Sequence, residues 1–238
     1  LLAYLVRRLL ENGSNTSFVN RIVDAARPVA SIVADPLQRA AAHPTKRHPH
    51  IPRPVDLFGR ERRNARGLDL SDPPTLAQLA AALAAAGPWT AAPLIAGASD
   101  PSGNRRPVIF PGDRRQSVGW VIDTAPAQLE QAMQAAARAV PMWQATAVDA
   151  RARCLDRAAD LLEDRTAEFM ALCVLEAGKT IADAAAEVRE AVDFCRYYAA
   201  CARRELAQPI LLPGPTGERN TLSRCGRGVF VCISPWNF

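Results

Sequence analysis

The chain has 238 residues, 49% of them hydrophobic and 22% charged, and its formal net charge is +5. This composition can supply a core for one large or two small domains, and it excludes collagen-like, disordered and disulfide-scaffold proteins. No apolar run reaches the roughly 18–20 residues that a membrane span needs. The chain begins at Leu1 without a secretory signal, and its last residues, 233–238, stop inside an apolar segment. We therefore expect a piece of a longer protein, with the cytoplasm as its default location.

Residues 1–27 are predicted to begin inside a helix whose apolar residues gather on one half of the wheel. Gly13 is expected to end this helix as a left-handed cap. The opposite half carries Tyr4, Arg7, Arg8 and Glu11. A solvated helix face is the ordinary interpretation of adjacent arginines. However, two guanidinium groups can bind one carboxylate from two directions, and a phenol can line the same pocket, so we also consider a ligand site here.

Residues 28–70 are rich in Pro, Arg and His and lack sustained periodicity, which predicts a linker. Seven Lys or Arg residues against two acidic ones lie between His43 and Arg66, so this stretch holds the whole positive excess. A basic nucleic-acid-binding module around residues 43–66 is one interpretation. A solvated connector is favoured, because the stretch has one aromatic residue, four prolines and no helical period. The three histidines lack metal-ligand spacing, and no metal is expected.

Downstream, an alanine-rich helix is predicted to open at Asp72-Pro73-Pro74 and to close at Gly87. The remaining pattern predicts strands, then helices, then strands, which indicates an α/β fold whose sheet is incomplete within these residues. The predicted strands cover residues 107–110, 117–122, 210–212, 221–223 and 228–233, and the predicted helices cover 126–140, 148–162, 165–177 and 181–204.

Two local motifs suggest chemistry that we exclude. Gly178-Lys179-Thr180 looks like the end of a phosphate-binding loop, but Cys173 stands where that motif requires glycine and a helix precedes it. Gly178 is therefore predicted to be a helix cap. The six cysteines contain no C-x-x-C pair and are expected to be buried free thiols.

The segment from Tyr4 to Gly13, continuing through Ser17-Phe18-Val19-Asn20-Arg21, resembles the last helix of the proline dehydrogenase barrel in the bifunctional proline utilization A family. The resemblance implies that Tyr4, Arg7 and Arg8 bind the substrate proline, the two arginines holding its carboxylate against FAD. It also implies that Glu11 and Phe18 lie near the flavin.

From about residue 91 the chain resembles the start of an aldehyde dehydrogenase, for example in Glu176-Ala177-Gly178-Lys179-Thr180 and in the run from Asp193 to Ala199. Residues 57–70 look like the connector between the two catalytic parts of the family. The implied domains are the C-terminal helix of a (β/α)8-type barrel at 1–27, an inter-domain linker with one helix at 28–90, and the truncated N-terminal part of an aldehyde dehydrogenase domain at 91–238.

Aldehyde oxidation in this family proceeds by thiolate attack on the aldehyde, hydride transfer to NAD and thioester hydrolysis. Asn237 matches the side-chain donor to the oxyanion and is the predicted catalytic residue. The backbone strip against which NAD lies is matched by Ile233, Ser234, Pro235 and Trp236. None of the six cysteines has the sequence setting of the nucleophile, and the general-base Glu is absent, so the isolated chain is expected to be inactive.

The implied function is NAD-dependent oxidation of L-glutamate γ-semialdehyde, formed from 1-pyrroline-5-carboxylate, to glutamate, with FAD-dependent proline oxidation in the whole protein. The expected partners are these small-molecule substrates and further copies of the chain in a homo-oligomer. Peripheral membrane association of the whole protein stays open, and nucleic-acid binding through this segment is not expected. The alternatives are an aldehyde dehydrogenase of other specificity, against which residues 1–70 argue, and the nucleic-acid module at 43–66.

Overall fold

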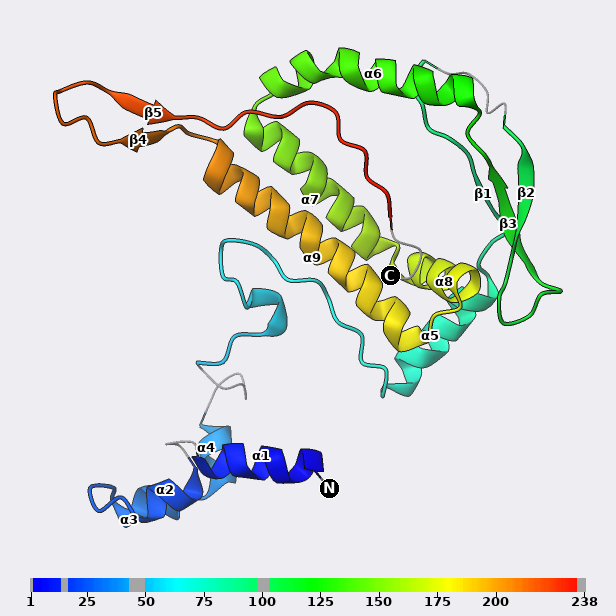
Figure 1. The fold of residues 1–238 in the computed structure, drawn as a ribbon. Helices are drawn as coiled ribbons and strands as arrows, with labels where there is room; N and C mark the ends of the chain where they lie inside the picture. Colours follow the sequence, from blue (N-terminus) through cyan, green and yellow to red (C-terminus); the bar gives the residue numbers. More distant parts are fainter. Residues whose placement is uncertain (1, 14–16, 43–49, 98–102, 235–238) are drawn as a thin grey trace. The chain divides into compact units, whose positions relative to one another are not determined.

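The computed structural model describes residues 2–13, 17–42, 50–97 and 103–234. Its contacts divide the chain into two compact units, residues 1–52 and 53–238, so the division falls inside the predicted linker (Figure 1). Within the described ranges, no helix has both the length and the hydropathy needed to cross a membrane. The two units are treated one at a time below.

The first unit consists of short helices: α1 (Leu2–Gly13), α2 (Phe18–Ile22), α3 (Val29–Ile32) and α4 (Pro36–Ala41). The predicted first helix is confirmed, but Gly13 is its last helical residue and not a left-handed cap. The predicted linker, residues 28–90, was expected to contain one helix, but α3 and α4 form there in addition to the alanine-rich helix. The Asp35 side chain accepts the Leu37 N–H at 2.8 Å, and Pro36 follows as the first helical residue, which is a favourable helix start.

The second unit is built around helices α5 (Pro73–Ala84), α6 (Pro126–Ala145), α7 (Val148–Asp164), α8 (Thr166–Ala177) and α9 (Ile181–Leu206). Helix α9 packs along α7 and also contacts α8, which in turn contacts α5 (Figure 1). The main apolar cluster consists of Leu79, Met170, Ala184, Ala185 and Val188. Small alanines at these crossings let the helix backbones approach closely, and this places the core between α5, α8 and α9.

The helix ends follow local chemistry. The Asp72 carboxylate accepts the Thr75 N–H at 3.0 Å and begins α5, which ends at Ala84, three residues before the predicted stop. Gly178 is confirmed as the cap of α8, with a left-handed φ of 67°. Thr180 then caps α9 by accepting the Asp183 N–H. Because a helix runs up to Gly178 and another starts directly after Thr180, this segment lacks the strand that a phosphate-binding loop requires.

A mixed sheet of three strands has the order β1 (Trp89–Ala91), β3 (Ser117–Ile122), β2 (Arg105–Ile109). Strand β1 runs parallel to β3, and β2 runs antiparallel to it. At Gly119, a Cβ atom would lie 2.0 Å from the Trp89 carbonyl oxygen, so the close approach of β1 requires glycine here. Strand β1 was not predicted, because its three residues carry no alternating pattern.

A second sheet is the hairpin of β4 (Ile210–Leu212) and β5 (Asn220–Leu222), which confirms two predicted strands to within a residue. The strand predicted over residues 228–233 is wrong, since this segment has no regular secondary structure. Its apolar sequence would suit a strand, but a strand needs a neighbour for its backbone hydrogen bonds. No neighbouring strand pairs with it among the described residues.

Residues 57–70, which we call the strap, contain no helix or strand. Most of them are exposed, but several side chains between residues 62 and 70 are covered by the helices. Ala65 is only 3% exposed and contacts Ala159 of α7 and Val192 of α9. Leu68 and Leu70 pack on the main apolar cluster. The expectation of a solvated connector over residues 43–66 therefore fails at the buried Ala65 and the half-buried Arg62 and Asn64, while most other described residues of that stretch are exposed. Periodicity could not reveal the packing because an irregular segment buries residues one at a time.

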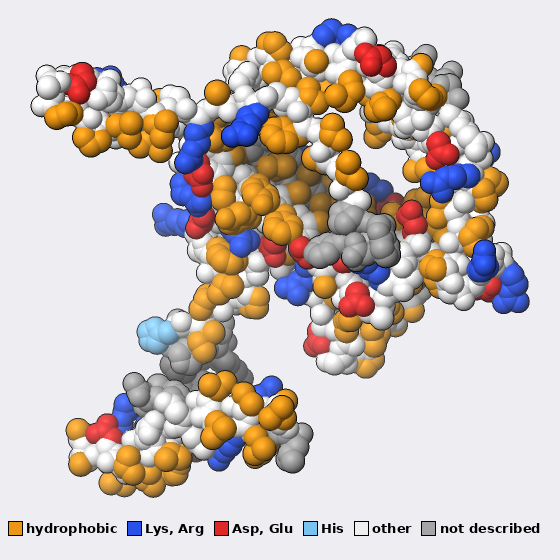
Figure 2. Space-filling view, viewed as in Figure 1, with side chains coloured by type: hydrophobic (Ala, Val, Ile, Leu, Met, Phe, Trp, Pro, Cys, Tyr) orange, Lys and Arg blue, Asp and Glu red, His pale blue; other side chains and the backbone are white. Residues whose placement is uncertain are grey.

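Apolar side chains are also spread over the surface of both units (Figure 2). In α1 the exposed residues include Leu2, Leu9 and Leu10, each more than 70% accessible. In the β4–β5 hairpin, Leu211 is 65% exposed. Neighbouring exposed apolar residues on one helix, as in α1, are typical of a face that contacts other protein.

Candidate functional site

The predicted proline-binding residues lie together on one face of α1. Tyr4, Arg7 and Arg8 occupy positions i, i+3 and i+4, which are neighbours on a helix surface. All three are exposed, and the Arg8 guanidinium contacts the Glu11 carboxylate at 3.4 Å. An exposed ion pair of this type contributes little to stability and leaves the guanidinium groups accessible. The helix therefore presents two cations and a phenol to one side, as the sequence predicts.

The two residues predicted to lie near a flavin are also accessible. Glu11 is on the same face of α1, one turn after Arg8, while Phe18 begins α2 and is 62% exposed. Ser17, just before it, accepts the Asn20 N–H and donates to the Asn12 carbonyl oxygen at 3.2 Å, so the α1–α2 corner is held by side-chain hydrogen bonds. This corner fixes where Phe18 stands relative to α1.

The predicted dehydrogenase residues are only partly described. Ile233 and Ser234 are exposed and lie in a segment without regular secondary structure. Pro235, Trp236 and Asn237 lie outside the described residues. Their proposed roles at NAD and at the oxyanion remain predictions.

The cysteines are all free, but the expectation that they are buried holds only in part. Cys173, Cys195 and Cys201 are half-buried, whereas Cys154, Cys225 and Cys232 are exposed. Burial raises the pKa of the Cys173 thiol, and the Glu187 carboxylate adds to this effect. Burial likewise raises the pKa of Cys195. Both thiols are thus poor nucleophiles, because the thiolate is the reactive form.

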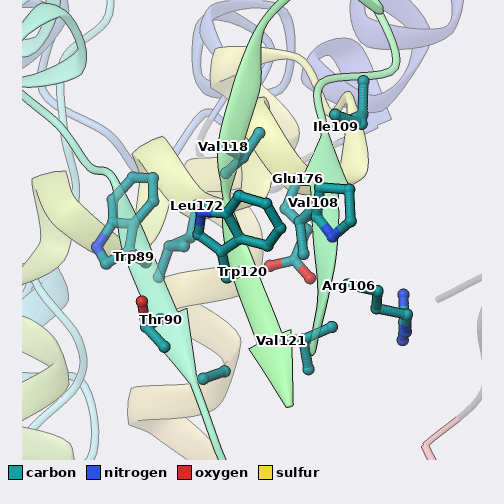
Figure 3. Close-up of a pocket in the computed structure, with 13 residues that line it drawn as sticks. Trp89, Thr90, Arg106, Val108, Ile109, Val118, Trp120, Val121, Leu172 and Glu176 are labelled. Carbon is teal, nitrogen blue, oxygen red and sulfur yellow. The ribbon is translucent and has the colours of Figure 1, made fainter. Parts of the chain in front are cut away.

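A pocket with a volume of about 650 Å³ lies between the three-stranded sheet and α8 (Figure 3). Trp89, Trp120 and Leu172 give it a mainly apolar wall, and Glu176 contributes a carboxylate. The Arg106 guanidinium at its edge is paired with Asp123 at 3.1 Å. The lining has no cysteine, serine or histidine that could act as a nucleophile or base. The pocket thus offers mainly apolar surface, with the Glu176 carboxylate and the Thr90 hydroxyl among its polar groups.

Some cations of the basic stretch are paired with carboxylates of the same chain, although Arg53 and Arg66 stay more than half exposed. Arg62 contacts Asp193 at 3.3 Å, and Arg66 contacts Glu163 at the same distance. Arg53 pairs with Asp56 at 2.8 Å. Lys46 and Arg47 lie outside the described residues. Across the residues that can be placed, no group of His, Cys, Asp and Glu has the geometry of a metal site.

An ion cluster built around a buried ion pair was not predicted. Arg196 of α9 reaches the Glu163 carboxylate and the Asp160 carboxylate of α7, each at 3.0 Å, and the side chains of Arg196 and Glu163 are only 7% and 6% exposed. Burial opposes the ionised form of Glu163. Hydrogen bonds from the Arg196 side chain and the Arg66 N–H, with the charges of both arginines, nevertheless lower the pKa of Glu163. The sequence offers little sign of this cluster, because Glu163 and Arg196 are 33 residues apart and meet only when α7 and α9 pack together.

The comparisons with known proteins agree with this fold. The model of the aldehyde dehydrogenase family matches residues 98–238, more than half of the chain. The chain therefore belongs to the aldehyde dehydrogenase family, and the helices and strands within residues 98–238 are part of that α/β fold.

The similarity to particular proteins extends beyond the family match. The bifunctional protein PutA of Salmonella typhimurium is 44% identical over 248 residues, which cover all of this chain and 18% of that protein. A crystal structure of bifunctional proline utilization A (PutA) superposes with a TM-score of 0.74 at 42% identity, over 100% of this chain and 21% of that one. A 1-pyrroline-5-carboxylate dehydrogenase from Thermus with bound NAD gives a TM-score of 0.65 at 31% identity, over 74% and 34% of the two chains. The chain thus spans about a fifth of the length of the PutA proteins that it matches.

Proposed function

We propose that this chain is part of a bifunctional proline catabolic enzyme that oxidises L-glutamate γ-semialdehyde to glutamate with NAD and oxidises proline with FAD. The observation that carries the proposal is the similarity to PutA over the whole chain, on both sides of the strap. An aldehyde dehydrogenase of other specificity would account for residues 98–238 but not for the match of residues 1–97.

In this proposal the helix face of Tyr4, Arg7 and Arg8 binds proline in a complete barrel. Two guanidinium groups offer paired charge-assisted hydrogen bonds to the carboxylate, and the phenol closes one side of the site. The accessibility of all three side chains on one face of α1 supports this role. Glu11 and Phe18, near the α1–α2 corner, would lie toward the flavin, which supplies the two-electron oxidation of proline.

At the other end of the chain, Asn237 would donate its amide to the oxyanion of the tetrahedral adduct. A neutral donor suits this position because it stabilises developing charge without itself having to be desolvated as an ion. Residues 233–236 would bind NAD, the hydride acceptor, mainly through backbone atoms. Ile233 and Ser234 fit this role, since they are exposed and are not engaged in a sheet.

The test separates the two activities in the longer protein that contains this chain. Asn237→Ala should lower the rate of NAD-dependent oxidation of glutamate semialdehyde by roughly 10²–10³ and leave proline oxidation unchanged. Arg7→Ala should weaken proline binding about 10- to 150-fold, the usual loss for one charge-assisted pair, and leave aldehyde oxidation unchanged. Turnover with each substrate is measured for both variants.

Arg39→Ala is the matched control, because Arg39 is an exposed arginine on α4 outside both predicted sites. It should alter neither activity. The proposal fails if the longer protein oxidises neither substrate, or if both substitutions affect the same activity.

A further inference from the structure

The strap is held by two carboxylates on the helices, and each of them accepts a backbone N–H. Asp193 of α9 accepts the Ala65 N–H at 2.8 Å and is also contacted by Arg62. Glu163 of α7 accepts the Arg66 N–H at 2.7 Å. Two consecutive backbone amides are thus bound by acidic groups on two different helices, which determines the position of the strap along both.

The side chain between these contacts is enclosed. Ala65 is inserted between α7 and α9, where it meets Ala159 and Val192, and Leu162 and Cys195 lie around them. Because Ala159 is fully buried and Val192 is 1% exposed, a side chain larger than methyl has no space here. The contact therefore selects a small residue at this position.

One of the two acceptors, Glu163, is also held by a residue outside the strap. Arg196 binds Glu163 through both carboxylate oxygens, at 3.3 and 3.0 Å, and is itself bound by Asp160. A carboxylate oriented in this way loses little further freedom when it accepts a hydrogen bond. On the flank, the Arg62 guanidinium lies 3.6 Å from the centre of the Phe58 ring and 5.8 Å from that of Tyr197.

We propose that the face formed by α7 and α9 is an intramolecular docking site for residues 62–66 of the strap, so that the dehydrogenase unit begins at the strap, well before residue 98. The site recognises a small residue, Ala65, with Arg62 three positions before it and Arg66 directly after it. The backbone N–H groups of Ala65 and Arg66 face Asp193 and Glu163 respectively. The basic character of this stretch then serves attachment to an acidic receptor within the chain. It does not serve binding to nucleic acid.

Hydrogen exchange and limited trypsin digestion of the 238-residue chain test this proposal. The amides of Ala65 and Arg66 should exchange slowly, and trypsin should cut slowly after Arg62, Arg63 and Arg66. Asp193→Ala removes one acceptor and should accelerate exchange at Ala65 by about 10- to 100-fold. Cleavage after Arg115, whose side chain is 92% exposed in the turn between β2 and β3, is the internal reference and should not change.

Asp164→Asn is the matched control, since Asp164 reaches Arg66 only at 3.5 Å and is 65% exposed. It should leave the strap protected. Ala65→Leu should release the strap without altering any helix residue. This second variant keeps the proposal testable if Asp193→Ala does not fold. Rapid exchange at Ala65 and Arg66 in the unmodified chain would overturn the proposal, as would unchanged protection in both Asp193→Ala and Ala65→Leu. Loss of that protection on addition of duplex DNA would instead identify nucleic acid as the ligand of the strap.

Discussion

At the scale of single residues, charged side chains join two helices and the strap in the second unit. Arg196 and Glu163 form a buried ion pair that joins α7 to α9 and carries the strap, and Asp160, which is 55% exposed, adds a second carboxylate contact to Arg196. Removing one partner of a buried ion pair lowers the stability of the fold more than replacing both partners with apolar groups, because the remaining charge stays buried and unpaired. The cluster thus determines how α7, α9 and the strap fit together.

Glu163 should make the stability of the second unit depend on pH. Its pKa is lower in the folded than in the unfolded state, where it is about 4.3. The unfolded state therefore binds the proton first, and the contribution of this carboxylate is present above that value and is lost as pH falls through the folded pKa. The difference in unfolding free energy between the unmodified chain and Glu163→Gln should shrink as pH falls below about 4.3.

Urea unfolding at a series of pH values measures this difference. Asp164→Asn, which removes the adjacent but exposed carboxyl group, is the matched comparison. A difference between the unmodified chain and Glu163→Gln that stays constant throughout the acidic range would show that Glu163 does not titrate with folding.

At the scale of elements, the helix ends are decided by short-range chemistry, and some of them also position neighbouring elements. Gly178 ends α8 in a left-handed conformation and lies against Pro111, in the turn that joins β2 to β3. The Gly178 N–H donates to the Val174 carbonyl oxygen at 3.0 Å, and the Lys179 N–H donates to that of Cys173 at 3.2 Å. This cap therefore also brings the sheet turn against the end of α8.

Gly178→Ala should destabilise the second unit by roughly 1–2 kcal/mol, the cost of a left-handed conformation for a residue with a Cβ. The new Cβ would also meet the Pro111 ring at 3.0 Å. Gly226→Ala is a suitable control because its Cβ would meet only Gln144, at 3.8 Å. Urea unfolding of both variants checks the prediction, and equal stabilities would contradict it.

At the scale of the whole molecule, the two units differ in how much they bury. Helices α1 to α4 contain no buried residue. Helix α9, by contrast, buries residues along most of its length, from Ala184 to Ala200. The longest helix of the first unit, α1, has 12 residues. Isolated helices shorter than about 12–15 residues are only marginally stable in water.

Hydrogen exchange should therefore separate the two units in this chain. Amides of α1 and α4 should exchange close to the rate of an unstructured chain, whereas amides of α9 around Val192 should exchange only through opening of the second unit. Mass spectrometry of peptides from each helix, after the same labelling time, gives the comparison. Protection of α1 equal to that of α9 would show that the first unit has a core of its own.

The sequence by itself determined the helices of the second unit, the hairpin strands, the cap at Gly178 and the resemblance that leads to the proposed function. These features depend on residues close together in the chain, through helical periodicity, capping groups and motif order. It also placed Tyr4, Arg7 and Arg8 on one helix face, because that requires only the helical repeat.

Only the tertiary structure decided that the strap docks, that β1 joins the sheet and that Arg196 meets Glu163. Each of these depends on partners far apart in sequence: Ala65 and Asp193 are 128 residues apart along the chain. An irregular segment such as the strap has no period that marks its buried side, so its acidic receptor becomes visible only when α7 and α9 lie together. The same reason explains the wrongly predicted strand at 228–233: its sequence is apolar, but strand formation depends on a neighbour that the sequence of the segment cannot specify.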